Sequence, residues 1–76
     1  MNTVMLIIEA RDAAGSGRGQ RLRHAAGISQ GELADAIGVT PACISRWEAG
    51  QRRPRGDAAM RYAQALRELA ERLAIA

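Results

Sequence analysis

The side chains in this 76-residue chain best suited to binding chemistry are its eleven basic residues, all of which are arginines. Four of them follow one another closely at Arg46, Arg52, Arg53 and Arg55. A guanidinium group carries a fixed charge and a planar set of donors that suits phosphate oxygens and carboxylates. The formal net charge of +3 allows a polyanionic partner. The composition does not identify one, because Arg in place of Lys is equally expected from GC-rich coding.

Groups suited to catalysis or metal binding are sparse. The single cysteine, Cys43, excludes an internal disulfide and a cysteine-based metal site, and we interpret it as a surface or half-buried residue rather than a redox switch. His24 lies in no metal-ligand or catalytic pattern, so we interpret it as a helix surface residue. With no nucleophile–base pair and little room for a pocket, we expect no enzyme, metal, cofactor or small-molecule ligand.

Length and composition limit the fold and the location. The chain permits one domain, and its hydrophobic fraction of 47% is too high for a disordered tail. With one Trp, one Tyr and no Phe, the core must consist mainly of aliphatic residues. The longest apolar run, Val4–Ile8, is too short to cross a bilayer, and we recognise no signal peptide. We expect no membrane association and a cytoplasmic protein.

Glycines recur between the apolar stretches, which is typical of short helices joined by tight turns. We expect an all-α fold, a compact bundle of about five helices, with residues 1–15 as an N-terminal segment and residues 16–76 as the main domain. Within Thr3–Ala14, residues Val4–Ile8 could form a strand by their β-branched content, but Glu9–Ala14 favour a helix and a lone strand would have no sheet to join. We therefore predict a helix there, separated from the rest by Gly15, Gly17 and Gly19.

The second and last helices are predicted from composition and spacing. The second should cover about Ser16–Ala26 and end at Gly27, a suitable left-handed cap. We expect its inward residues to be Leu22, Ala25 and Ala26. The last should cover about Gly56–Leu73, with Asp57 in its first turn. Its apolar stripe could face either the core or a partner helix; the stripe consists of Tyr62, Leu66, Leu69 and Leu73.

Two short helices with clear starts lie within residues 29–50. Ser29 and Glu32 match a capping box, and the helix they begin should end at Gly38. Thr40 is a good N-cap with Pro41 at the first helical position, and Gly50 closes this next helix. The residues expected to face the interior are Leu33, Ala34, Ile37, Val39, Ile44 and Trp47. The outer face of the second of these helices should then be small, polar and cationic, and such a face can enter the major groove of a duplex.

This stretch resembles the Cro/repressor helix-turn-helix family, the phage lambda repressor-like DNA-binding domains. The matching residues are Ser29-Gln30, Glu32-Leu33-Ala34, Gly38-Val39, Ile44-Ser45, Trp47-Glu48, Gly50 and Pro54. The resemblance covers about Gln20–Leu69 and leaves Val4–Gly19 outside the usual five-helix core. It implies a lambda repressor-like fold and a sequence-specific regulator that binds operator DNA as a homodimer.

The resemblance also implies a role for each matching residue. The residues implied to face bases are Thr40, Pro41, Ala42, Cys43 and Arg46. Those implied to contact phosphates are Ser29, Gln30, Ser45, Arg52, Arg53 and Arg55. Arg23 is implied to pair with Glu48. The chain departs from the family at Pro41-Ala42, where many relatives carry amide side chains, so base reading should depend heavily on Arg46.

Several alternatives remain open at this point. Arg46 could only neutralise phosphate, and the arginines that follow could form a solvated loop. The chain could instead be a protein-interaction module, such as an antitoxin that masks another protein. Dimerisation is expected through the last helix, aided by Val4–Ile8.

Overall fold

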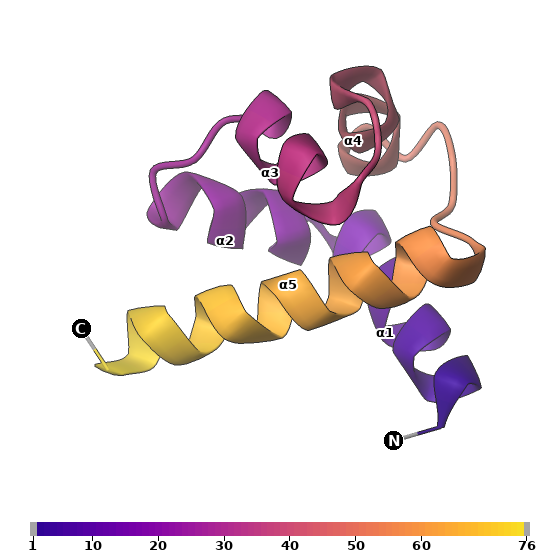
Figure 1. Ribbon diagram of the computed structural model, residues 1–76, viewed down its shortest axis with the longest axis horizontal. Helices are drawn as coiled ribbons and strands as arrows, with labels where there is room; N and C mark the ends of the chain where they lie inside the picture. Colours follow the sequence, from indigo (N-terminus) through magenta and orange to yellow (C-terminus); the bar gives the residue numbers. More distant parts are fainter. Residues whose placement is uncertain (1, 76) are drawn as a thin grey trace.

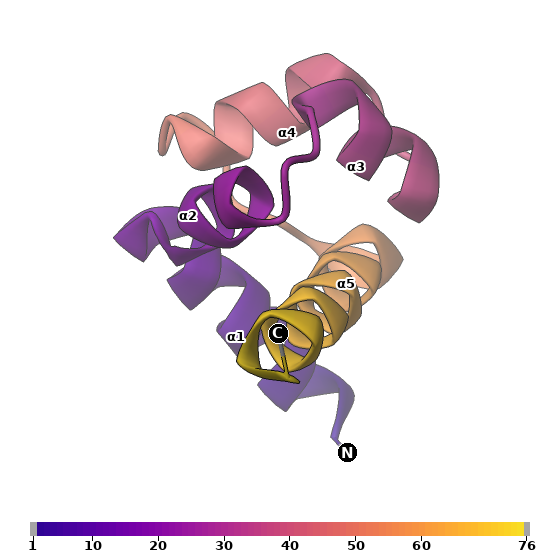
Figure 2. The same ribbon diagram turned by 90° about the vertical axis from the view of Figure 1, so that its left-hand side faces the viewer.

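The computed structural model describes residues 2–75, which form an all-α bundle as the sequence predicts (Figure 1). Its helices are α1 (Thr3–Ser16), α2 (Arg18–Ala25), α3 (Gln30–Ile37), α4 (Pro41–Glu48) and α5 (Gly56–Ile75). Figures 1 and 2 show α3 and α4 together on one side of the molecule, with α5 and the N-terminal end of α1 on the other. No helix within residues 2–75 is long and apolar enough to cross a membrane.

The N-terminal segment is a helix and not a strand. The Asn2 side chain caps it by accepting a hydrogen bond of 2.8 Å from the Val4 amide. It ends at Gly17, whose φ of 83° is a left-handed conformation that residues with a Cβ adopt poorly. Gly17 alone separates α1 from α2, so the prediction that Gly15 and Gly19 also break the chain is wrong: Gly15 lies within α1 and Gly19 within α2.

The inward face of α2 differs from the expected one. Ala25 is exposed, and Leu22 and Ala26 are only half-buried, whereas Gly19 and Arg23 are buried. The helix also begins at Arg18, two residues later than predicted, because the left-handed Gly17 precedes it. Gly19 and Arg23 lie one turn apart and face inward because their partners, described below, are on α4 and α5. The apolar pattern of α2 alone therefore misplaced its buried face.

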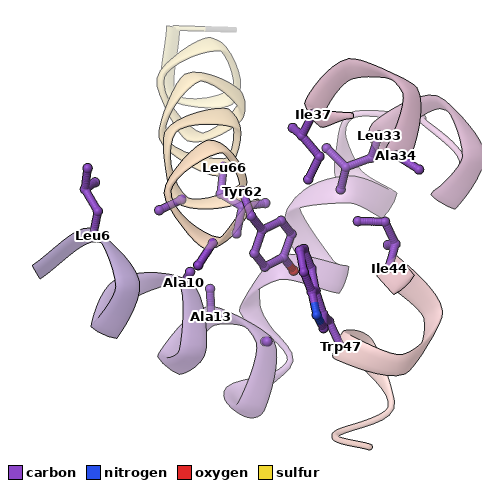
Figure 3. Packing of buried hydrophobic residues seen from close by; sticks show 13 residues of the cluster. Leu6, Ala10, Ala13, Leu33, Ala34, Ile37, Ile44, Trp47, Tyr62 and Leu66 are labelled. Atoms are coloured by element: carbon purple, nitrogen blue, oxygen red, sulfur yellow. The ribbon is translucent and has the colours of Figure 1, made fainter. Parts of the chain in front are cut away.

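The buried apolar residues form a single cluster, shown in Figure 3. They come from α1, α3, α4 and α5: Leu6, Ala10, Ala13, Ala14, Leu33, Ala34, Ile37, Ile44, Trp47, Ala59, Tyr62, Ala63 and Leu66. The Trp47 and Tyr62 rings lie at its centre with centroids 4.9 Å apart and planes tilted by 50°, a favourable arrangement for two aromatic rings. Small alanines on both α1 and α5 allow these two helices to pack closely.

The apolar stripe of α5 divides along its length. Tyr62 and Leu66 are buried in the core, while Leu69 and Leu73 are half-buried. The first half of the stripe thus belongs to the fold of the single chain. Only the second half remains available to a partner.

Candidate nucleic-acid interface

The start of α3 has the predicted capping box. The Ser29 hydroxyl accepts a hydrogen bond of 3.0 Å from the Glu32 amide, and the Glu32 carboxylate accepts one of 2.8 Å from the Ser29 amide. In any α-helix the amides of the first turn lack intrahelical acceptors. The Ser29 hydroxyl accepts from the Glu32 amide only, so the cap leaves the Gln30 and Gly31 amides at the N-terminus of α3 without an intrahelical acceptor. With the positive end of the helix dipole, this is a suitable place for an anionic oxygen.

The turn between α3 and α4 fixes how the two helices meet. Gly38 has a φ of 75°, and the Val39 amide donates a hydrogen bond of 3.0 Å to the Ala34 carbonyl. Leu33, Ala34 and Ile37 are buried on the inner side of α3, as predicted. Val39 is half-buried against the same cluster. The turn therefore presents the beginning of α4 at the surface while its inner side joins the core.

The side chains of α4 divide between the core and the surface as the sequence predicts. The Thr40 hydroxyl caps the helix by accepting a hydrogen bond of 3.1 Å from the Cys43 amide. Ile44 is 0% exposed and Trp47 4% exposed. The outward residues are Thr40, Pro41, Ala42, Ser45 and Arg46, all exposed. Cys43 is half-buried and packs against the core, so its thiol lies at the margin of the outer face.

The end of α4 is tied to α2 by a buried ion pair. Arg23 Nε and Nη2 donate hydrogen bonds of 2.7 and 2.9 Å to the two carboxylate oxygens of Glu48, and Arg23 Nη1 donates one of 3.0 Å to the Ile28 carbonyl. The side chains are only 8% and 3% exposed. This is the pair that the family resemblance implied. It joins the helix before the motif to the last turn of α4.

The hydrogen bonds of this pair determine its protonation. The hydrogen bond to Glu48 raises the pKa of Arg23. Burial alone would raise the pKa of Glu48, but the hydrogen bonds from Arg23 and Gln30, with the nearby positive charges, lower it below 4.5. Both groups therefore stay charged at neutral pH, and their attraction acts where water is largely excluded.

Gln30 has a contact that the sequence does not reveal. Its amide nitrogen donates a hydrogen bond of 3.0 Å to Glu48, so the side chain expected to bind phosphate is also the third member of the buried network. The two residues are 18 positions apart, and no local spacing rule connects them. Gln30 has a second amide N–H, which keeps its predicted phosphate contact possible.

The arginines after α4 lie in the segment that joins α4 to α5. The helix ends with hydrogen bonds from the Gly50 amide to the Trp47 carbonyl and from the Gln51 amide to the Arg46 carbonyl. Arg52, Arg53 and Arg55 are exposed, whereas Pro54 between them is buried. The three arginines line an open hollow of about 600 Å³ beside α4 together with Cys43, Trp47 and Ala58. The structure thus brings these arginines to the flank of α4.

The assembled surface has one geometric and one electrostatic feature. A short helix with small outward residues projects beside a cationic loop, and Arg46 supplies a long donor on that helix. Such a surface can approach a polyanion with low relief and positive charge. Among the residues that the structure describes, no cluster of His, Cys, Asp or Glu could hold a metal ion.

The comparisons with known proteins agree with this geometry. The family model described as Helix-turn-helix matches residues 20–73, which is most of the chain; it includes α3 and α4 completely and α2 from its third residue onward. The match begins after α1. No curated protein and no solved structure is similar enough to count as a match.

Proposed function

The chain belongs to the Cro/C1-type helix-turn-helix family of DNA-binding domains, and from this membership we propose that it is a transcriptional regulator, of the repressor or Cro type, that reads operator DNA with α4 in the major groove. The observation that carries the proposal is the division of α4 into a buried side with Ile44 and Trp47 and an exposed, low-relief side. The major groove is wide enough for one helix of this kind.

In this proposal the exposed side of α4, from its N-cap to Arg46, contacts the bases. The base-facing residues are Thr40, Pro41, Ala42, Arg46 and, at the margin, Cys43. Pro41 and Ala42 have no donors or acceptors in their side chains, so they can contribute only apolar contacts, for which a thymine methyl is a suitable partner. Arg46 is the side chain able to form two hydrogen bonds with one base, and guanine is the commonest choice for arginine.

The phosphate contacts would surround the base-facing residues of α4. The first turn of α3 supplies Ser29 and Gln30, α4 supplies Ser45, and the following loop supplies Arg52, Arg53 and Arg55. Phosphate contacts fix register and orientation but carry no sequence information directly. The arginines would give most of the affinity for any duplex, and α4 most of the discrimination.

We further propose that the protein binds its operator inside the cell as a homodimer. A single short helix offers few base contacts, and a two-fold pair doubles them over two half-sites. Tyr62 and Leu66 are buried within one chain, so the expected pairing through α5 would rest on Leu69 and Leu73. Val4, Met5 and Ile8 would aid it, since these are the exposed large apolar residues of α1.

Selection of bound sites from random duplex DNA tests the proposal. We expect a defined motif in two half-sites related by a dyad, with centres about 10 base pairs or a multiple of that apart. Ala42→Glu would place a carboxylate among the base-facing residues of α4 and should abolish the enrichment of bound sites. Ala25→Glu makes the same change at an exposed position of α2 and should leave the motif intact. No enrichment with the unaltered chain, or equal loss with both variants, would contradict the proposal.

A second function is favoured by the exposed apolar side chains of α1. Val4 and Met5 are 58% and 54% exposed, which fits a protein-interaction module of the antitoxin kind as well as it fits a dimer. Figures 1 and 2 show the N-terminal end of α1 far from α4, so a protein bound there would leave α4 uncovered. A stable complex with another protein, with no DNA binding and no effect of Arg46→Ala, would favour this function over the first.

A further inference from the structure

One contact joins α1, which lies outside the matched family region, to the arginine-bearing loop. Arg11 Nε donates a hydrogen bond of 2.9 Å to the Pro54 carbonyl, across 43 positions of sequence. Pro54 lies between Arg53 and Arg55, and its ring is among the most deeply buried side chains of the molecule. The hydrogen bond is partly buried, so water competes with it less than it would at the open surface.

Apart from the buried ring of Pro54, the loop has few other restraints. Residues 51–55 form no regular secondary structure between α4 and α5 (Figure 1). At its start, the Gln51 and Arg52 amides bond to the Arg46 carbonyl, and at its end Arg55 accepts from the Ala59 amide in the first turn of α5. Pro54 has no amide N–H to donate. Its carbonyl is therefore the backbone group through which the middle of the loop is held.

The surroundings of this contact also come from α1. A hollow of about 220 Å³ lies behind the loop, and Arg11, Asp12, Ala14 and Gly15 form its α1 side. The opposite side includes Trp47 and Gly50 of the α4 end, with Arg52, Arg53 and Pro54 of the loop. Residues of α1 therefore face the backbone between two of the exposed arginines across this hollow, and the hydrogen bond from Arg11 to Pro54 joins its two sides.

We propose that Arg11 is a positioning residue for DNA binding, which holds loop 51–55 so that Arg52, Arg53 and Arg55 present a fixed set of charges beside α4. The inference rests on the proposed function and adds to it a residue that the family match does not cover. Arginine suits this task because its guanidinium is planar and charged at all relevant pH values. Arg11 acts through Pro54 and need not touch the nucleic acid.

Hydrogen–deuterium exchange on the free protein tests the positioning itself. Arg11→Gln should accelerate exchange of the loop amides at residues 51–53 and leave the amides of α3 unchanged. Arg67→Gln is the matched control, because it also removes an arginine that ties α1 to another element, through its 2.7 Å pair with Glu9. Because this ion pair is exposed, its loss should have little effect on the exchange of the loop amides. Equal exchange of the loop amides in both variants would overturn the proposal.

DNA binding supplies the second measurement. Arg11→Gln should weaken duplex binding by about three- to tenfold, the range expected for the loss of one typical hydrogen bond, and should lower the salt dependence. In a background with Arg52, Arg53 and Arg55 all replaced by Gln, the same change should have almost no effect, since it acts through these residues. An unchanged effect in that background would show that Arg11 acts by its own charge and would overturn the proposal.

Two further outcomes are decisive. If Arg11→Gln does not fold, Arg11→Lys carries the test, because it keeps the charge but replaces the planar donor by a flexible one. If its loop amides then exchange as slowly as in the unaltered chain and the salt dependence of duplex binding is unchanged, the positioning role of Arg11 is contradicted. If the unaltered chain binds no duplex, the proposed function fails, while the exchange measurement still decides the role of Arg11.

Discussion

The guanidinium of Arg23 and the carboxylate of Glu48 face each other through two hydrogen bonds of 2.7 and 2.9 Å in a site from which water is largely excluded. Gln30 joins the same carboxylate from the first turn of α3. The three side chains thus connect α2, the start of α3 and the end of α4, which are the elements that must keep a fixed geometry for α4 to project. The pair is a structural support of the proposed interface rather than a contact with DNA.

Removing one partner of this pair should be strongly destabilising. Arg23→Met leaves the Glu48 carboxylate buried without its main partner, and we expect a loss of about 3–5 kcal/mol in the free energy of unfolding. Urea denaturation measures it. Arg21→Met on the same helix is the control, because Arg21 is exposed, and it should cost well under 1 kcal/mol. Similar midpoints for the two variants would contradict the structural role of the pair.

The lowered pKa of Glu48 predicts a contribution to acid unfolding. Because the folded pKa lies below the usual 4.5, the ionised carboxylate stabilises the fold above that pH, and the contribution disappears as the pH falls through the folded pKa. Glu48→Gln has no such titration. The difference in unfolding free energy between the two proteins should therefore shrink steadily below pH 4.5. A constant difference from pH 6 to pH 3 would mean that folding does not lower the pKa of Glu48.

The local signals in the sequence predicted most of the helix boundaries. The capping box at Ser29, the cap at Thr40 and the end of a helix at Gly38 depend on residues within a few positions of one another, and all are confirmed. The exposed side of Ala25 and the buried side of Arg23 were not predictable from α2 alone. They depend on Glu48 and Tyr62, which come from distant parts of the chain.

The same distinction applies to the candidate site. The exposed side of α4 follows from the helical spacing of its buried residues, so the residues on that side could be named from the sequence. The hydrogen bonds from Gln30 to Glu48 and from Arg11 to Pro54 join residues 18 and 43 positions apart. Each depends on the packing of whole helices. A single sequence contains no pattern that specifies such packing.

The close approach of Gly19 to Tyr62 gives a prediction about the core. A Cβ at Gly19 would collide with the Tyr62 hydroxyl and would lie 3.1 Å from the ring carbon that bears it. Gly19→Ala should therefore destabilise the fold by about 1–3 kcal/mol through overpacking. Within residues 2–75 this hydroxyl has no hydrogen-bond partner, and burial, with the Glu48 charge, raises its pKa to about 12.

Tyr62→Phe should consequently be neutral or stabilising, because it removes a buried and unsatisfied polar group while retaining the ring. In the Phe background, Gly19→Ala should cost less than it does in the unaltered chain. Thermal unfolding of the two single variants and the double variant measures this coupling. Strictly additive changes would show that the hydroxyl is not what limits space at Gly19.

The arginines of loop 51–55 should contribute affinity without discrimination. Arg52→Ala or Arg53→Ala should weaken binding to operator and to random duplex alike, and should reduce the slope of log affinity against log salt by about one. Arg72→Ala, on the exposed side of α5 near its end, removes the same charge far from α4 and should leave the slope almost unchanged. A titration in which the loop variants keep the full slope would remove these residues from the interface.

Arg46 should contribute discrimination. It is exposed on α4, next to the buried Trp47 that fixes the orientation of the helix, and it is the only arginine in that helix. Arg46→Ala should cost about 1–3 kcal/mol of binding to the selected operator and relax the preference at one base pair of each half-site. Its effect on random duplex should be no larger than that of Arg53→Ala. Affinity measured on a set of single-base operator variants distinguishes the two roles, because equal losses on operator and random duplex would identify Arg46 as a phosphate contact only.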